Sequence, residues 1–291
     1  MELDRFAPRS RWLTAVRRLG RDVPLAATEF DWNSHEWYDI AANKGVLLLA
    51  AVRAELGDEA FETFMDDFGR AHAGRPTATS EFVAAAEEAA DRSLAELFEP
   101  WLKGERAATA DTGNFWSIDS FEIEPDRALI VYGTRQESQA QREAAELLQR
   151  KIARRWSNIT PPIRSEDDVS DDDLRDHHLL LIGRPATNEI ARRYAKGLPV
   201  RFGNGSFVIR EETYAHAESA VVCAGQNPLN PRYEIVIYTG LGADATRRLI
   251  ESLPDRGGAP AEILLLPAGQ KPRRLAVTNV MEQKATKEAK K

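Results

Sequence analysis

The sequence is poor in cysteine and in long apolar runs. It contains one cysteine, Cys223, so no disulfide can form within the chain. Cys223 lies in the apolar run 219–224, which favours a buried strand residue over a nucleophile. No apolar run approaches the roughly 20 residues that span a bilayer, and residues 1–20 lack the continuous apolar core of a secretory signal. We therefore expect a soluble chain without a signal peptide or a membrane span.

Negative charge outnumbers positive charge. Lys and Arg number 39 against 46 Asp and Glu, which gives a formal net charge of −7. A protein that neutralises nucleic-acid phosphates needs a basic face, and no basic patch interleaved with aromatic residues occurs. The composition therefore disfavours a nucleic-acid partner. An apolar content of 43% over 291 residues is typical of a globular chain with room for two domains.

The first part of the chain has the apolar spacing of helices. An apolar helix is expected to end at Gly57, where a glycine cap is common. The next helix begins with acidic residues, which suit a helix N-terminus, and residues 79–82 resemble a capping sequence. The expected helices cover residues 45–56, 58–68, 83–90 and 94–101, and a short amphipathic helix is expected around residues 12–19.

From residue 115 onward, strands and helices alternate. Strands that are apolar on both faces and separated by helices indicate a mainly parallel sheet covered on both sides. Residues 203–205 (GNG) are interpreted as a hairpin turn, and the acidic segment 165–176 as a solvated loop. Strands are expected at 129–133, 179–183, 206–209, 219–224, 234–238 and 262–266, and helices at 136–156, 187–196 and 243–253.

These patterns predict an N-terminal helical bundle followed by a mainly parallel α/β sandwich domain. Between the two parts the sequence is rich in small and polar residues and has no apolar periodicity, which is typical of a linker. The predicted organisation is a helical domain at 1–104, a linker at 105–114, an α/β accessory domain at 115–275 and a charged tail at 276–291.

Four short motifs of the helical half carry a family resemblance. They are residues 38–45 (YDIAANKG), 56–61 (LGDEAF), 75–82 (RPTATSEF) and 97–101 (LFEPW). In order and spacing they resemble zinc aminopeptidases of the aminopeptidase N type, in the helical region that follows the zinc motif. The resemblance covers about seventy residues and implies peptide hydrolysis in the parent family.

The zinc site of that family has no counterpart in this sequence. The family holds zinc with two histidines of an H-E-x-x-H motif and with a glutamate on a following helix. The nearest string here is HEWYD at 35–39, which makes His35 and Asp39 candidate ligands. Residues 38 and 39, however, also belong to the motif at 38–45, which matches a segment that lies after the zinc site of the family. We therefore expect no cofactor in this chain, and zinc only in a full-length parent enzyme.

A tyrosine of the family is also replaced. The resemblance places it two residues before the Lys-Gly pair, where it donates a hydrogen bond to the oxyanion of the reaction intermediate. That position is Ala42 in this sequence, and Tyr38 lies about one helical turn earlier. Tyr38 is therefore a catalytic candidate by substitution. The alternative, which the sequence favours, is that Tyr38 packs against the bundle.

The α/β half resembles an accessory domain attached to bacterial serine peptidases of the prolyl oligopeptidase type. This resemblance, which implies an architecture and no reaction, is carried by residues 130–134, 177–188, 198–199, 227–231 and 233–237. No G-x-S-x-G nucleophile motif occurs in this half. The adjacent His177 and His178 begin a strand, so their side chains are expected on opposite faces, which is poor geometry for a shared metal.

The α/β half also contains a candidate ligand site. Strand ends and a following helix start place backbone N–H groups where an anion binds in open α/β sheets. The simpler interpretation is a well-capped turn. The candidate residues are Gly133, Thr134, Gly183, Arg184, Thr187 and Asn188.

The leading functional prediction is a non-catalytic C-terminal portion of a zinc-metallopeptidase-like protein. Its helical half would form a cleft wall, and its α/β half would assist docking. The expected partners are a missing N-terminal catalytic lobe or another protein, and peptides. The alternative is a stand-alone module that binds a protein, a small ligand or an anion. An exposed apolar face around residues 47–52 would favour the first prediction.

Overall fold

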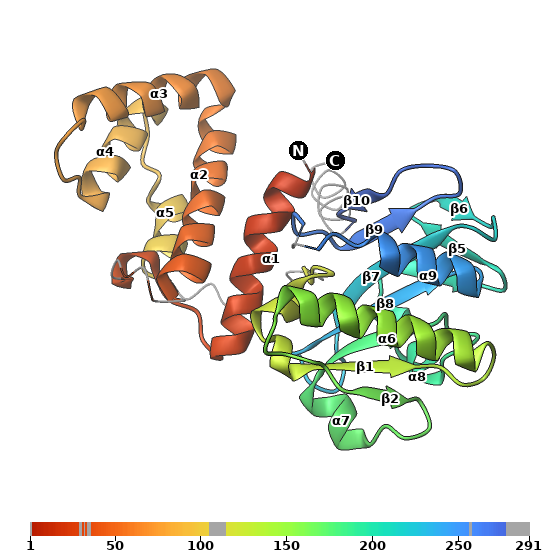
Figure 1. Ribbon diagram of the computed structural model, residues 1–291. Coiled ribbons are helices and arrows are strands. Elements are labelled where there is room, and N and C mark those ends of the chain that lie inside the picture. Colours follow the sequence, from red (N-terminus) through yellow and green to blue (C-terminus); the bar gives the residue numbers. More distant parts are fainter. Residues whose placement is uncertain are drawn as a thin grey trace. The chain divides into compact units, whose positions relative to one another are not determined.

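The chain forms two compact units (Figure 1). The helical unit comprises residues 11–111, and the α/β unit comprises residues 1–10 and 112–291. Residues 1–10 thus group with the α/β unit, although the sequence pattern assigned them to the helical domain. The computed structural model describes residues 2–28, 31, 33, 36–104, 115–255 and 258–277. The predicted linker and residues 278–291 of the predicted tail lie outside this described part.

The helical unit follows the predicted order of helices. Gly57 ends α2 with a φ of +83°, which a residue without Cβ adopts at little cost. The cap of α4 is Ala78 and not Thr79: the N–H of Ala78 donates to Glu81 Oε2 at 2.8 Å. The division at residue 11 falls within α1 (Glu2–Leu19). The other helices of this unit are α2 (Ala42–Leu56), α3 (Asp58–Ala71), α4 (Thr79–Ala90) and α5 (Ala95–Leu102), with a 3-10 turn at Leu25–Ala27 and a π-helical segment at Glu36–Ala41.

Aromatic rings hold α3, α4 and α5 together. The ring of Phe82 on α4 lies 5.2 Å from those of Phe64 and Phe68 on α3, and 6.3 Å from that of Phe98 on α5. These aromatic pairs add to the stabilisation from buried apolar area. Phe64 and Phe68, one helical turn apart, therefore lie on the side of α3 that faces α4.

The α/β unit is built on a mixed sheet with a parallel core, which confirms the predicted fold class. Strands β2, β1, β3 and β8 are parallel neighbours, whereas β7, β9 and β10 continue the sheet in antiparallel pairs. The sheet order is β10-β9-β7-β8-β3-β1-β2. The strands are β1 (Ala128–Tyr132), β2 (Ile163–Ser165), β3 (His178–Ile182), β7 (Ala220–Gln226), β8 (Glu234–Gly240), β9 (Ile263–Leu266) and β10 (Arg273–Leu275).

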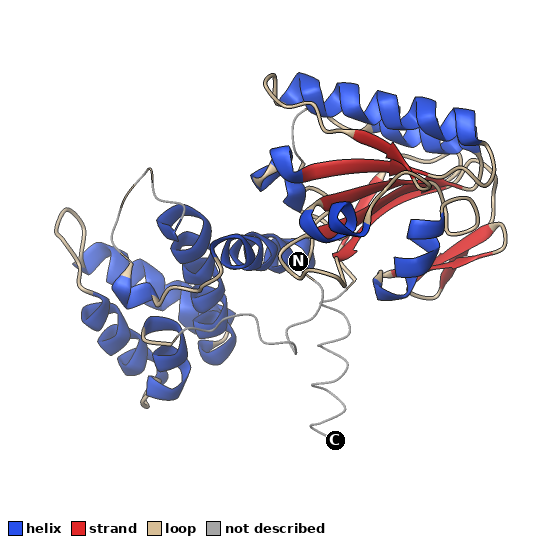
Figure 2. Cartoon of the chain, turned by 90° about the horizontal axis from the view of Figure 1, so that it is seen from below, coloured by secondary structure: helices blue, strands red, loops and turns tan. Residues whose placement is uncertain are grey.

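Both faces of this sheet are covered (Figure 2). On one face, Leu148 of α6 (Ser138–Arg155) and Leu249 of α9 (Ala243–Ser252) share a buried cluster with sheet residues. On the other face, the cluster includes Ile190 of α8 (Glu189–Tyr194). A small antiparallel sheet also covers this second face; it consists of β4 (Val200–Gly203), β5 (Ser206–Ile209) and β6 (Glu212–Tyr214). This covering on both sides explains why the central strands are continuous apolar runs.

Short elements were absent from the sequence prediction. They are the strands β2, β4, β6 and β10, the helix α7 (Asp171–Asp176), and 3-10 turns at Ser120–Ile123 and Pro125–Arg127. A further 3-10 turn, at Ala195–Gly197, forms the end of the helix expected at 187–196. The expected solvated loop at 165–176 is therefore partly wrong, because α7 lies within it. Ser170 caps α7: its Oγ accepts from the Asp173 N–H at 3.1 Å, and hydrogen bonds from Ser170 hold the pKa of Asp173 below its ordinary value.

Candidate functional site

The candidate ligand residues come together at one edge of the α/β sheet. Gly133 follows β1 and Gly183 follows β3, and these parallel strands are neighbours. The helix after β1, α6, packs on one face, whereas the helix after β3, α8, packs on the other. The ends of β1 and β3 are thus a topological switch point, which is the usual ligand position in open α/β sheets.

Both glycines are required by close packing at this edge. A Cβ on Gly133 would lie 2.0 Å from the backbone oxygen of Thr187. Gly183 has a φ of +108°, and a Cβ there would lie 2.3 Å from Gln141 Oε1. The two glycines therefore admit neighbouring protein atoms, which leave little space for a bound ligand.

Gln141, which the sequence prediction did not include, fills the space above the two glycines. Its side chain is buried; Oε1 accepts from the Gly133 N–H at 3.0 Å, and Nε2 donates to the backbone oxygen of Gln136 at 2.8 Å. A polar residue in the first turn of the helix after β1 is the only sequence signal for this role.

Glu166 occupies the position that an anion would take. It is buried directly after β2, and its Oε1 accepts from the Thr134 N–H at 2.6 Å and from the Thr134 hydroxyl at 2.9 Å. Its Oε2 accepts from the N–H of Glu189, the first residue of α8. Asp167 Oδ2 lies 2.7 Å from the same hydroxyl, whose single proton serves one carboxylate at a time. The chain thus supplies its own carboxylate to the helix start.

The remaining candidates cap and tie the turn after β3. Asn188 Oδ1 accepts from the Ala191 N–H at 3.0 Å, and its Nδ2 donates to Ile182 O at 2.9 Å. Thr187 Oγ1 donates to Arg184 O at 3.3 Å, and Arg184 Nη1 donates to Leu241 O at 2.5 Å. The geometry favours the interpretation as a well-capped turn over that as an anion site.

Glu189 adds a charged cluster outside this turn. It forms ion pairs with Arg135 and with Arg192. The hydrogen bond from Arg192, together with the nearby Arg135, holds the pKa of Glu189 below its ordinary value. Glu189 is thus paired with two arginines of the same chain, and we interpret this cluster as a structural ion-pair network and not as a ligand site.

Tyr38 is exposed in the π-helical segment. Its exposed fraction is 56%, and its ring lies 5.8 Å from that of Trp37. The interpretation in which Tyr38 packs against the bundle is therefore wrong. The following turn is held by Asn43, whose Nδ2 donates to Asp39 O at 2.8 Å. π-Helical turns occur often at functional sites.

The two metal candidates do not assemble a site among the described residues. His35 lies outside them, and Asp39 is partly exposed beside Tyr38. Within the part of the chain that the structure describes, no group of three or more His, Cys, Asp or Glu side chains is close enough to hold a metal ion.

His177 and His178 are placed differently: His177 is the C-cap residue of α7, whereas β3 begins at His178. His178 is buried, and its Nδ1 accepts from the Glu234 N–H at 3.3 Å. Burial, with Arg232 and His177 nearby, lowers the pKa of His178 to about 3. The ring of His177 instead lies 3.0 Å from Asp173 O. Cys223 is fully buried, and burial raises the pKa of its thiol, so it is no nucleophile.

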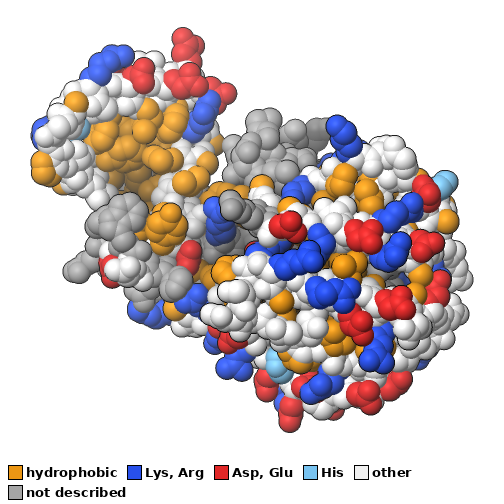
Figure 3. Space-filling model, in the orientation of Figure 1, with side chains coloured by type: hydrophobic (Ala, Val, Ile, Leu, Met, Phe, Trp, Pro, Cys, Tyr) orange, Lys and Arg blue, Asp and Glu red, His pale blue; other side chains and the backbone are white. Residues whose placement is uncertain are grey.

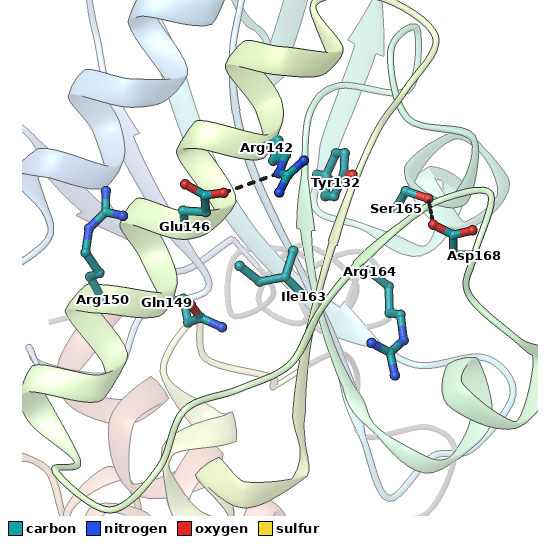
Figure 4. Close-up of a pocket in the computed structure, with 9 residues that line it drawn as sticks. All are labelled: Tyr132, Arg142, Glu146, Gln149, Arg150, Ile163, Arg164, Ser165 and Asp168. Carbon is teal, nitrogen blue, oxygen red and sulfur yellow. Dashed lines mark hydrogen bonds and ion pairs between the residues drawn. The ribbon is translucent and has the colours of Figure 1, made fainter.

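An open polar pocket of about 720 Å³ lies beside β2 and α6 (Figure 4). Its carboxylates are engaged: Arg142 donates to Glu146 at 3.3 Å, and the Ser165 hydroxyl donates to Asp168 at 2.6 Å. Figure 4 shows the Arg150 and Arg164 side chains directed away from each other. The pocket therefore has no convergent set of donors for one ligand.

A larger groove, of about 960 Å³, lies in the helical unit along α3 and α4. Figure 3 shows hydrophobic side chains gathered on the surface of this unit. The groove is lined by residues 56–60, Thr63, Phe64, Asp67, Phe68, Ala71, His72, Ala85, Glu88 and Ala89. Its apolar floor distinguishes it from the polar pocket of the α/β unit.

No protein-family model matches this sequence, and no curated protein matches it. Among the helices of the described residues, none has the length and apolar character to cross a membrane.

Proposed function

We propose that this chain is a non-catalytic portion of a zinc-aminopeptidase-like protein and that its helical unit binds a polypeptide. The observation that supports this proposal is the incomplete burial of α2. Residues 46–52 of α2 are all apolar, yet among them only Leu48 and Val52 are buried. Val46 has an exposed fraction of 52%. A helix that is apolar all round is normally buried, so further protein is expected on this helix.

The position of Tyr38 supports the same proposal. Tyr38 and Val46 are both exposed and lie eight residues apart on one continuous helical segment, about 12 Å along its axis. The resemblance to zinc aminopeptidases assigns this segment to the region after the zinc motif. In our proposal it forms one wall of a peptide cleft, and a separate catalytic lobe supplies the zinc ligands.

Metal content and activity test the catalytic half of the proposal. The purified chain is analysed for zinc by mass spectrometry, and a fluorogenic aminoacyl substrate is added in the presence of zinc. We expect neither stoichiometric metal nor turnover. Near one zinc per chain together with turnover would overturn the proposal and make His35 and Asp39 ligands.

Self-association tests the binding half. Exposed apolar surface on α2 predicts concentration-dependent association in sedimentation velocity. Val46→Glu is expected to abolish it. Leu229, with an exposed fraction of 44% in the α/β unit, provides a matched control, and Leu229→Glu is expected to leave association unchanged. Equal effects of the two substitutions would contradict a binding role for α2.

The alternative function, an anion-binding module, has less support. The N–H groups of Gly133, Thr134 and Glu189 already have acceptors within the chain. Calorimetric titration with inorganic phosphate decides between the two. Saturable binding that Arg184→Ala removes would favour the anion module.

A further inference from the structure

The groove along α3 and α4 has an apolar floor. Phe64 is buried, Phe68 is partly buried, and small residues, Ala60 and Ala89, stand at the exposed margin. From Ala60 to Ala71 the groove follows α3 for about 16 Å, since a helix rises about 1.5 Å per residue. This length fits about three turns of a second helix.

One end of the groove is acidic. Helices α3 and α4 are packed together, and Phe68 in the last part of α3 contacts Phe82 in the first part of α4, so the two helices run in opposite directions. The start of α3 therefore lies beside the end of α4, and the ion pair between Glu55 and Arg92 links these same regions. Glu59 and Glu88 both line the groove in this region.

Two of the carboxylates that line the groove form no ion pair with a described Lys, Arg or His side chain. Asp58 pairs with Arg53, and Asp67 pairs with Arg70. Glu59 and Glu88 form no ion pair with any described residue. The described lining also contains no Lys or Arg. The groove thus combines an apolar floor with uncompensated negative charge at one end.

We propose that this groove binds an amphipathic helix of about three turns, with apolar anchors at i, i+4 and i+7 and basic residues at one end. This inference rests on the proposed function, because it names the class of polypeptide that the helical unit takes and a second surface for it. The apolar face of the partner lies on Phe64 and Phe68. Its Lys or Arg side chains lie beside Glu59 and Glu88, where charge complementarity fixes the orientation.

Peptide binding to the full chain tests this. The probes are two fluorescein-labelled helical peptides of about 14 residues with identical leucine anchors, one with three lysines at one end and one with three glutamates there. Fluorescence anisotropy measures Kd. We expect the basic peptide to bind the wild-type chain at least about tenfold more tightly than the acidic peptide.

Charge reversal and groove filling provide the variants. Glu59→Lys with Glu88→Lys is expected to reverse the preference, whereas Glu96→Lys, on exposed α5 surface outside the groove, leaves it unchanged. Ala60→Trp is expected to fill the groove and so to raise the Kd of both peptides by at least about tenfold. Ala54→Trp, on exposed α2 surface, is its control.

The two proposals fail separately. Equal affinity of the wild-type chain for both peptides, or an unchanged preference in the double variant, overturns the groove assignment. The Val46→Glu result on association is independent of the groove, because Val46 does not line it. If the peptides show no charge preference but Val46→Glu abolishes self-association, the groove assignment is wrong and the proposed function stands.

Discussion

The ammonium group of Lys44 lies 3.0 Å from the carboxylate of Asp22, and both side chains are fully buried. Lys44 also donates to Val23 O at 2.6 Å. Asp22 in turn accepts from the Trp12 indole and from the Val23 N–H, both at 2.9 Å. This network ties the start of α2 to the segment after α1, and so positions the helix on which Tyr38 and Val46 are exposed.

Lys44→Met is expected to destabilise the helical unit by about 3–5 kcal/mol, because it leaves the Asp22 charge buried without a partner. Urea denaturation followed by far-UV circular dichroism measures the free energy of unfolding. Adding Asp22→Asn, which keeps an acceptor for Trp12 and Val23, is expected to recover part of the loss. Lys103→Met, which removes an exposed pair with Glu99, should cost about 0.5 kcal/mol or less. Equal losses for Lys44→Met and Lys103→Met would contradict the role of the buried pair.

Gly133→Ala is expected to destabilise the α/β unit by about 1–3 kcal/mol or more, because its Cβ would meet the backbone oxygen of Thr187 at 2.0 Å. The control is Gly197→Ala, where no described atom lies within 4 Å of the added Cβ. Thermal unfolding of both variants tests the difference. A melting temperature of Gly133→Ala within error of the control would show that the turn is looser than described.

Glu166→Ala is expected to cost about 2–3 kcal/mol, because it leaves the N–H groups of Thr134 and Glu189 without acceptors. Asp167→Ala removes an exposed carboxylate that accepts a hydrogen bond from the Thr134 hydroxyl, and a smaller loss is expected. Comparing the two free energies of unfolding tests whether Glu166 is the internal anion of this edge.

His178 predicts a loss of stability in acid. Its pKa is lowered to about 3 in the folded chain, against about 6.5 when unfolded. Folding therefore favours the neutral ring, and its contribution is complete above pH 6.5 and is lost as the pH falls toward 3. The slope is about 1.4 kcal/mol per pH unit at most. Denaturation at pH 7.5, 5.5 and 4.5 measures it.

The matched variant for this slope is His178→Asn, which keeps an acceptor for the Glu234 N–H. Its stability is expected to fall less steeply between pH 6.5 and 4.5. Substitution of the exposed His216 by Asn should leave the wild-type slope unchanged. A slope in His178→Asn as steep as that of the wild type would assign the acid sensitivity to other groups.

Cys223 is expected to be inert in the folded protein. It is fully buried, and burial raises its pKa, so thiolate is not formed at neutral pH. A thiol-specific chromogenic reagent should detect no thiol in native protein and about one per chain in concentrated urea. Fast reaction of the native protein would show that β7 opens locally.

The sequence predicted the fold well where local chemistry determines structure. Gly57 ends α2, and residues 203–205 form the hairpin between β4 and β5, as their turn chemistry indicates. The direction of the strands could not be predicted as well from the sequence. β7 is as apolar as β3, yet it is antiparallel to β8, because an apolar run reports burial on both faces and not direction. β2 and β6 are only three residues long and carry charged residues, so their pattern is weak.

The sequence predicted where the candidate site lies in the sheet, but it did not predict which side chains fill it. The residues after β1 and β3 do meet at one edge. Glu166 was assigned to a solvated acidic loop, and its role depends on Thr134, which lies 32 residues earlier in the chain. Such contacts arise from tertiary packing, and local spacing does not encode them. The exposure of Tyr38 was missed for the same reason.

The α/β unit joins distant parts of its own sequence at one seam. Ile118 N–H donates to Ala261 O at 2.8 Å, and Ala261 N–H donates to Ser117 Oγ at 3.0 Å. Arg274 adds a 2.9 Å contact with Asp119. During synthesis, residues 117–119 therefore lack these contacts until more than a hundred later residues have emerged from the ribosome, whereas the helical unit is already complete at residue 111. The helical unit is therefore expected to fold before the α/β unit during translation. The apolar β1 and β3 segments are exposed in the meantime, and we expect chaperones to bind them.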